Sequence, residues 1–470
     1  MHRRLDGRRA EIRTAHPNFA DSVVQCCLRP VHRGHARTSA PRTLVAPKAT
    51  CDSMQASSST VEQPPQLSAP LSFEHRHGVR DQSGRVLLKS LNQEELEEWC
   101  TAVGEPPKRA KQLLKALYGK GRWVRRLEEM DNDPAMAFSA QFKAKVSAAA
   151  SLSGGMTLQS VQTARDGTHK LVFSLAEGEG GARGSVETVL IPMTNRSGTN
   201  LRYTACLSTQ VGCAMNCQFC YTGRMGLQGN LSTAQIVEQA APLPRSVPIS
   251  NIVFMGMGEP LDNFDCVMAA IDVLAQGLEL ARSKIIVSTV GLADRMDEFL
   301  SSKKAKLALS LHATTDEVRN WIVPTNRRFP LQRLVTTLEQ HFPAHAPSAR
   351  GDNFVVLEYV LLGGVNDSLA DAERLVALTA NIYCMVNLIV FNPWEGTTFK
   401  KSTDQAVRAF RGVLMAAGRV CTLRVSKGDD EMAACGQLGD PGQGRKRVPI
   451  AEPPAAFRQL VAGAVAVSGA

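Results

Sequence analysis

The sequence has few aromatic residues and no long apolar segment. Phe, Trp and Tyr together make up 5% of its 470 residues. No uncharged apolar run approaches the roughly 18 to 20 residues that a membrane-spanning helix needs, and the apolar stretch at residues 460–467 is too short. We therefore expect neither an integral membrane protein nor a membrane partner. The length is sufficient for two or three units with a full-sized core.

The chain also lacks the dense, evenly spaced cysteines of a small secreted domain. Its twelve cysteines are unevenly distributed, and no hydrophobic signal-peptide region precedes them. This usage favours a reducing compartment. Seven of the cysteines lie in the N-terminal tail or in apolar and helical surroundings typical of incidental thiols: Cys26, Cys27, Cys51, Cys100, Cys266, Cys384 and Cys421.

Acidic residues are scarce near the N-terminus. Residues 1–60 hold ten arginines and lysines against four acids, which accounts for +6 of the formal net charge of +10. Residues 1–75 are rich in Arg, Ser, Ala, Thr and Pro and show no apolar period, which predicts an organellar transit peptide and a disordered linker. We expect a chloroplast protein, with the mitochondrion as the alternative. If the tail is instead a basic segment that stays attached, the protein is cytoplasmic.

Residues 76–152 are predicted to form a helical accessory domain. Asn92 with Glu95 three residues later is a capping box that begins one helix, and Pro106 opens a second. Tyr118 and Trp123 lie within a basic stretch. This pattern is typical of RNA binding, and it is equally typical of a solvated helix face with two aromatic residues in the core. The basic residues are Lys108, Arg109, Lys111, Lys115, Lys120, Arg122, Arg125 and Arg126.

The rest of the chain is predicted to be α/β. Residues 153–198 read as a small β connector of two or three strands. Within residues 199–440, apolar strand-like runs alternate with helical patterns, which predicts a parallel sheet in a partial (β/α)6-type barrel. These runs lie at residues 252–255, 285–288, 307–311, 355–362, 385–391 and 421–425. Residues 441–470 form a C-terminal tail.

Three cysteines lie within eight residues, at Cys213, Cys217 and Cys220. A structural zinc site or a fully ligated iron–sulfur cluster needs four ligands, so three indicate a cluster iron left open for a substrate. The spacing CxxxCxxC with the aromatic Phe219 before the last cysteine is the signature of the radical S-adenosylmethionine (SAM) superfamily. The resemblance implies one [4Fe-4S] cluster on these thiols that binds and cleaves SAM.

Further motifs narrow the resemblance to one family. The chain from about residue 90 to 440 resembles the RlmN/Cfr family of radical SAM enzymes, which methylate C2 of adenine in ribosomal and transfer RNA. The motifs, in chain order, are VETV at 186, CLSTQVGCAMNCQFC at 206, MGMGEP at 255, VSTVG with its serine at 288, SLHA at 310, EYVLLGGVND at 358, NLIVFNP at 387 and GDDEMAACGQL at 428.

The resemblance implies a mechanism that uses two SAM molecules per turnover. Adenine C2 is electron-poor, so transfer of a methyl cation fails there and a radical route is required. One SAM methylates Cys435, and a second yields the radical that takes hydrogen from that methyl group. Glu187 accepts a proton, and Cys206 releases the product as a disulfide with Cys435 forms. External reduction then restores both thiols.

The resemblance also implies the SAM contacts and the partners. The glycines of GMGEP allow close backbone approach, and Glu259 is placed to accept a hydrogen bond from the SAM amino group. The SAM contacts carried over are Gly258, Glu259, Ser288, Ser310, Leu311, His312 and Asn392. The expected partners are large-subunit ribosomal RNA, transfer RNA as a second candidate, and an electron donor such as ferredoxin or flavodoxin. We expect a monomer.

Two departures and two alternatives stand beside this interpretation. Residues 193–199 lengthen the segment between Glu187 and the cysteines, and Gly229 replaces an arginine usual in the family. The first alternative keeps the chemistry but methylates adenine C8, as in the antibiotic-resistance branch of the family. The second is a non-catalytic RNA-binding or zinc-ribbon module, which predicts bound zinc and no role for Cys435.

Overall fold

The computed structural model describes residues 71–119, 123–124, 126–132, 138–175, 184–194, 198–199, 201–241, 247–345, 351, 353–424, 426–439, 448 and 450–460. The predicted transit peptide, apart from its last five residues, lies outside these ranges, as does most of the predicted C-terminal tail. In the described residues, no helix is long and apolar enough to cross a membrane.

The N-terminal unit is helical. Asn92 caps its first long helix: the Glu95 N–H donates to Asn92 Oδ1 (2.9 Å), and the Asn92 N–H donates to Glu95 Oε2 (3.0 Å), which confirms the predicted capping box. The elements are β1 (Val86–Leu87), η1 (Leu88–Ser90), α2 (Gln93–Ala102), α3 (Arg109–Tyr118), η3 (Leu127–Asn132), α4 (Ala140–Ala149) and β2 (Ala150–Ser151).

The two aromatics of the basic stretch belong to the core. Tyr118 is 2% exposed and Trp123 1% exposed, and their rings meet edge to face with centroids 5.3 Å apart. Neither ring is available for stacking on a base, so the RNA-stacking interpretation of this stretch is wrong for these two residues. Burial of such large aromatic side chains contributes strongly to the stability of a core. Lys120, Arg122 and Arg125 lie outside the described residues.

A buried ion pair fastens this unit to the rest of the molecule. Lys89 Nζ in η1 lies 2.9 Å from Glu238 Oε1 at the end of α6 (Thr233–Glu238), with the two side chains 2% and 7% exposed. The same carboxylate oxygen accepts the Gly154 N–H (2.9 Å). These hydrogen bonds compensate for burying both charges.

A ten-stranded sheet occupies the centre, in the order β14-β13-β12-β11-β10-β9-β6-β5-β4-β3. Each strand from β6 to β14 in this row is parallel to its neighbour. All six runs predicted as barrel strands form strands here, and the predicted fold class is confirmed. Their bounds are β9 (Ile249–Phe254), β10 (Ile285–Thr289), β11 (Lys306–Ser310), β12 (Val355–Leu361), β13 (Cys384–Val390) and β14 (Val420–Arg424). The seventh strand of the parallel row is β6 (Arg202–Cys206).

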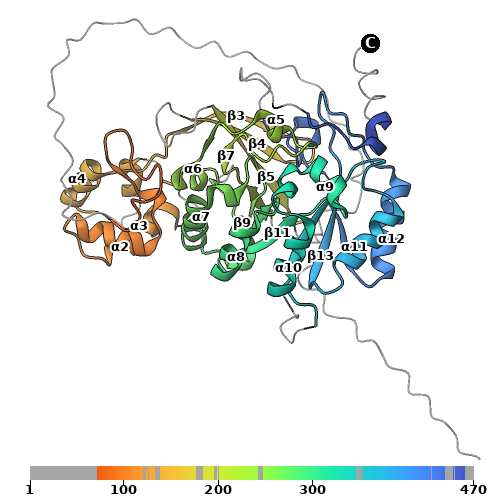
Figure 1. Ribbon diagram of the computed structural model, residues 1–470. Helices are drawn as coiled ribbons and strands as arrows, with labels where there is room; N and C mark the ends of the chain where they lie inside the picture. Colours follow the sequence, from red (N-terminus) through yellow and green to blue (C-terminus); the bar gives the residue numbers. More distant parts are fainter. Residues whose placement is uncertain are drawn as a thin grey trace, which may run out of the picture.

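Helices cover the outer face of the curved sheet (Figure 1). All seven residues of β12 are buried, as expected of a central parallel strand with packing on both faces. Because the strands are parallel, their carboxyl ends share one edge of the sheet, and the site lies at that edge. The helices are α7 (Phe264–Gly277), α8 (Ala293–Ser302), α9 (Asp316–Ile322), α10 (Leu331–His341), α11 (Leu369–Leu378) and α12 (Asp404–Ala416).

The predicted β connector is continuous with this sheet. It forms the antiparallel strands β3 (Met156–Thr163), β4 (His169–Leu175) and β5 (Ser185–Met193), and β5 pairs with β6. The register sets Val189 opposite Cys206 and Met193 opposite Arg202. The lengthened segment therefore lies at the end of this pairing, with residues 195–197 outside the described ranges, and it leaves Glu187 near the Cys206 end of β6.

Candidate functional site

The three clustered cysteines lie in a loop between β7 (Gln210–Val211) and the short helix α5 (Tyr221–Met225). Gly212 makes this loop possible. Its φ is +71°, and a Cβ at this position would approach Gly226 O within 1.8 Å. A residue with a side chain does not fit there without moving the backbone. Gly229 pairs with Val211 in the β7–β8 ribbon (β8, Gly229–Asn230) beside this loop.

All three thiols line one cavity at the carboxyl ends of the strands. Burial raises the pKa of each, and the negative charge of neighbouring thiolates raises the pKa of Cys213 and Cys217 further. Three converging sulfurs of this kind are stabilised as thiolates by a bound cationic centre. In the described residues, no three His, Cys, Asp or Glu side chains are arranged around a single metal ion. The three thiols that line this cavity are the donor set of an iron–sulfur cluster with one open iron.

Opposite the thiols, the loop after β9 presents Glu259. The N–H of Val290 donates to its Oε2 (2.9 Å) and the N–H of Leu261 to its Oε1 (3.1 Å). Burial raises the pKa of Glu259 to about 7, although these hydrogen bonds oppose the rise. Gly258, with φ +97°, permits the close approach of this loop, since a Cβ there would lie 2.6 Å from the Gln210 side chain.

The ends of β10 and β11 contribute hydroxyls and an imidazole. Ser288 Oγ and Ser310 Oγ are 3.3 Å apart at the cavity wall. The His312 Nδ1 accepts the Val360 N–H (3.1 Å), which places the proton of the neutral ring on Nε2. Burial, followed by the nearby Arg319, lowers the pKa of His312 to about 3, so the ring is neutral at physiological pH.

Arg319 organises these strand ends, and no sequence motif singled it out. It is fully buried and its guanidinium donates to the backbone oxygens of Leu311 (2.8 Å), Val290 (2.7 Å) and Ser310 (3.0 Å). Leu311, also predicted as a SAM contact, is buried and is not a lining residue of the cavity.

The loop that carries Cys435 closes the cavity from the C-terminal side. It is tied to the cluster helix, because the Tyr221 N–H donates to Gly436 O (2.8 Å) and Thr222 Oγ1 to Leu438 O (2.6 Å). Asn392 Nδ2 donates to Cys435 O (3.1 Å). Asn392, predicted as a SAM contact, therefore also positions the Cys435 loop. The Cys435 side chain faces the same cavity as the cluster thiols.

Cys206 lies at the end of β6 in a small neighbouring cavity, which Cys435 also lines. Both thiols are free. Burial raises the pKa of Cys206 to about 12, and the charge of Arg424 opposes this rise. The structure thus brings the two predicted redox cysteines to one small space, although 229 positions of sequence separate them.

Glu187 lies beside these cavities rather than in their lining. Its Oε2 accepts the Gly439 N–H (3.0 Å), and its Oε1 lies 3.8 Å from Lys170 Nζ, with both side chains buried. Gly439 is four residues beyond Cys435, so the carboxylate is held against the loop that carries this cysteine.

Two charged residues in the cavity were missed by sequence reasoning. Arg424 on β14 lines both the cluster cavity and the small cavity, and its Nη1 lies 3.7 Å from Met255 Sδ. Glu358 on β12 is 5% exposed and accepts Asn387 Nδ2 (2.9 Å). The sequence did hold a signal for both residues, because each is a charged residue within an otherwise apolar strand-like run.

Comparison with known proteins agrees with this geometry. The sequence model of the Radical SAM superfamily matches residues 207–376. "Dual-specificity RNA methyltransferase RlmN" of Syntrophotalea carbinolica is 41% identical over 360 residues, 76% of this chain and 91% of the relative. The protein of the same name from Geotalea uraniireducens is 42% identical over 356 residues, 75% of this chain and 96% of the relative.

A solved structure is also similar. The crystal structure of a radical SAM methyltransferase from Sphaerobacter thermophilus aligns with a TM-score of 0.65 and 34% identity, and the alignment covers 75% of this chain and 98% of that one. With near-complete coverage of relatives above 40% identity and with the three-thiol cavity in place, the chain belongs to the RlmN family of dual-specificity RNA methyltransferases within the radical SAM superfamily.

Proposed function

We propose that this enzyme methylates C2 of an adenosine in 23S-type large-subunit ribosomal RNA, with transfer RNA as a second substrate. The observation that carries the proposal is the single cavity that joins the three cluster thiols, Glu259 and the thiol of Cys435. The names of the relatives supply the RNA substrate class. When bound, the [4Fe-4S] cluster and SAM supply a 5′-deoxyadenosyl radical, which removes hydrogen from an otherwise unreactive methyl group.

Residues of this chain carry out the other steps, beginning with methyl transfer to Cys435. The Cys435 thiolate attacks the methyl group of a first SAM: the new S–C bond forms as the bond from carbon to the SAM sulfonium breaks. Arg424 favours that thiolate, since its positive charge acts to lower the pKa of Cys435. The carbon on Cys435 becomes the carbon that joins adenine C2.

Product release falls to Glu187 and Cys206. Glu187 accepts the proton that leaves C2, and its position against Gly439 keeps the carboxylate beside the Cys435 loop. The Cys206 thiolate attacks the Cys435 sulfur and a disulfide forms as the bond from that sulfur to the transferred carbon breaks. That carbon keeps the bonding electrons and takes up a proton to become the methyl group. A two-electron reductant must restore both thiols before the next turnover. The small cavity shared by the two cysteines supports this step.

We further propose a monomer that receives electrons from a ferredoxin or flavodoxin and acts in the chloroplast. The support for location is the basic, acid-poor composition of residues 1–75. A fluorescent fusion to those residues tests it: chloroplast import supports the proposal, whereas mitochondrial import selects the alternative organelle and diffuse cytoplasmic signal rejects a transit peptide.

The direct test is nucleoside mass spectrometry of RNA incubated with anaerobically reconstituted protein, dithionite and methyl-labelled SAM. We expect labelled 2-methyladenosine from the wild type and none from Cys435→Ser. Cys206→Ala is expected to accumulate RNA joined to protein. Cys384→Ser is the matched control, since Cys384 is a thiol distant in the fold at the start of β13, and it should retain turnover.

Two outcomes would change the proposal. Labelled 8-methyladenosine would move the chemistry to the alternative ring position. No methylated adenosine from iron-loaded wild-type protein would reject adenine methylation while leaving the cluster site intact.

A further inference from the structure

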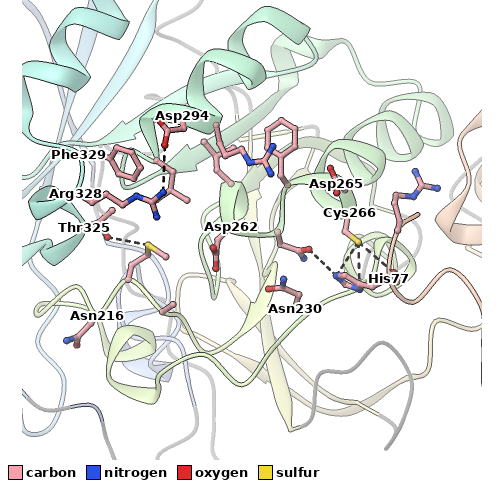
Figure 2. A pocket seen from close by; sticks show the side chains of 18 of the residues that line it. His77, Asn216, Asn230, Asp262, Asp265, Cys266, Asp294, Thr325, Arg328 and Phe329 are labelled. Atoms are coloured by element: carbon pink, nitrogen blue, oxygen red, sulfur yellow. Dashed lines mark hydrogen bonds and ion pairs between the residues drawn. The ribbon is translucent and has the colours of Figure 1, made fainter. Parts of the chain in front are cut away.

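A second, larger hollow lies on the other side of the cluster loop. This groove has a volume of about 750 Å³. Figure 2 shows it from close by, with Asn216, Thr325 and Arg328 on one side and His77 and Cys266 on the other. Its walls come from the cluster loop, the start of α7, the start of α8, the segment around η7 (Pro324–Arg327), and the N-terminal unit. The mechanism proposed above makes no use of it.

One side chain lines both this groove and the cluster cavity. Met215 lines both spaces, and it lies between the first two cluster ligands in the sequence. Thr325 Oγ1 donates to Met215 Sδ (3.3 Å), which holds that side chain against η7. Ala214 and Asn216 complete the stretch of the loop that faces the groove. The groove therefore offers access to the cluster from outside without passing through the cavity that SAM and the adenine must fill.

The rim on the side of α8 and η7 is basic. Arg295 and Arg328 line the groove with side chains 50% and 78% exposed. Exposed Arg327 and Arg333 lie next to them. Arg295 pairs with Glu298 (2.7 Å), and Asp294 is shared by Arg328 (3.8 Å) and Arg333 (3.0 Å), so two carboxylates face four guanidinium groups. The rim keeps a surplus of positive charge that suits an acidic protein surface.

The groove is poorly suited to an RNA strand. An RNA strand along the groove would carry its phosphates past the carboxylates of Asp262 and Asp265, whereas a folded acidic protein can contact the basic rim alone. The target adenine must also reach Cys435, which lines the other two cavities and not this one. A partner that needs proximity to the cluster but not to Cys435 fits the groove better.

We infer that the groove is the docking site of the one-electron donor, a small acidic flavin or iron–sulfur protein that delivers its electron past Met215. The inference rests on the proposed function only in that the enzyme must receive electrons. The transfer is balanced: the donor loses one electron, the oxidised cluster gains that electron, and no bond between heavy atoms forms or breaks.

The test is the rate of cluster reduction by a reduced flavodoxin, followed by stopped-flow absorbance on the anaerobic full-length holoenzyme without RNA. The double variant Arg295→Glu/Arg328→Glu reverses the charge of the rim. The matched control is Arg408→Glu/Arg411→Glu, which reverses two exposed arginines on α12. Dithionite, which needs no docking surface, reports whether the cluster is otherwise intact.

We expect the second-order rate constant with flavodoxin to fall about tenfold or more in the rim variant at low salt. The difference should shrink at about 1 M salt, where the Debye length is roughly 3 Å. The control variant and the dithionite rate should match the wild type. If charge reversal disturbs folding, the neutral Arg328→Gln, at the more exposed position, should still lower the rate, by about threefold.

An unchanged flavodoxin rate in the rim variant, or an equal fall in the α12 control, overturns the inference. So does weakened binding of an RNA hairpin with an unchanged flavodoxin rate, which would make the groove an RNA surface. Because the readout is cluster reduction, wild-type protein that accepts electrons from flavodoxin but makes no methyladenosine would reject the proposed function and leave the docking site standing.

Discussion

Replacing Arg424 by glutamine should slow the release of methylated RNA. Arg424 lines the small cavity shared by Cys206 and Cys435, and its charge favours the thiolate form of both. The pKa of Cys206 is about 12 even with this charge in place, so at pH 8 roughly one thiol in ten thousand is ionised. A neighbouring opposite charge shifts a pKa by roughly one to three units. Its loss should reduce the thiolate, and the release rate, about tenfold or more.

The assay follows the decay of the RNA–protein species on denaturing gels in a single turnover, between about pH 7 and pH 9. Both enzymes work far below the pKa of Cys206, so each rate should rise about tenfold per pH unit. The Arg424→Gln profile should be displaced to higher pH by about one unit or more. Arg424→Lys keeps the charge and should recover most of the rate.

Equal release rates for wild type and Arg424→Gln across this pH range would refute the electrostatic role of the guanidinium. A slower rate in Arg424→Gln that Arg424→Lys does not recover would also refute it, because that result is expected of a packing defect. Iron content and cluster absorbance, measured on the same samples, exclude a loss of the cluster as the cause.

Three further predictions concern the scaffold and the SAM site. Lys89→Met leaves the carboxylate of Glu238 buried without its cation. Denaturant unfolding should therefore show that the free energy of unfolding falls by about 3 to 5 kcal/mol, and Lys89→Met/Glu238→Leu should recover much of this loss. A loss below about 1 kcal/mol in Lys89→Met would contradict the prediction. Because the pKa of Glu259 is about 7, its carboxylate is protonated at lower pH, and SAM affinity measured by equilibrium dialysis should fall about tenfold from pH 8 to pH 6; Glu259→Gln should abolish that dependence. Gly212→Ala puts a Cβ 1.8 Å from Gly226 O, so the purified variant should hold little iron. Gly412→Ala on α12 is the control and should keep its iron, because a Cβ at that position meets nothing within 4 Å.

Local pattern was sufficient to predict several parts of this molecule. The capping box at Asn92 forms as predicted because it depends on residues three positions apart. The six apolar runs become strands because a buried parallel strand needs apolar side chains on both faces. The cluster ligands are also local, since one loop carries all three thiols.

Other features could not be read from local pattern. The basic stretch with Tyr118 and Trp123 has the composition of a nucleic-acid surface, yet both rings are buried. Composition does not indicate which way a side chain points. Packing against Gly277 of α7 determined it here, because a Cβ at that glycine would lie 2.6 Å from the Tyr118 ring. The family resemblance identified Cys206 and Cys435. Only the structure shows that Arg424 lines the cavity that these two cysteines share.

The chemistry of this protein is readable from the order of its residues: three thiols at CxxxCxxC spacing, glycines where the loops turn, and the motif order of an RNA methyltransferase. These are covalent and local properties, and they are fixed by which residues stand near one another in the chain. Only the tertiary structure decided which charges share a cavity with the two redox cysteines, how Glu187 is held against the Cys435 loop, and that Met215 lines both the cluster cavity and a second groove. Burial and electrostatic interaction depend on distance in space, which strands far apart in sequence set when they pack into one sheet.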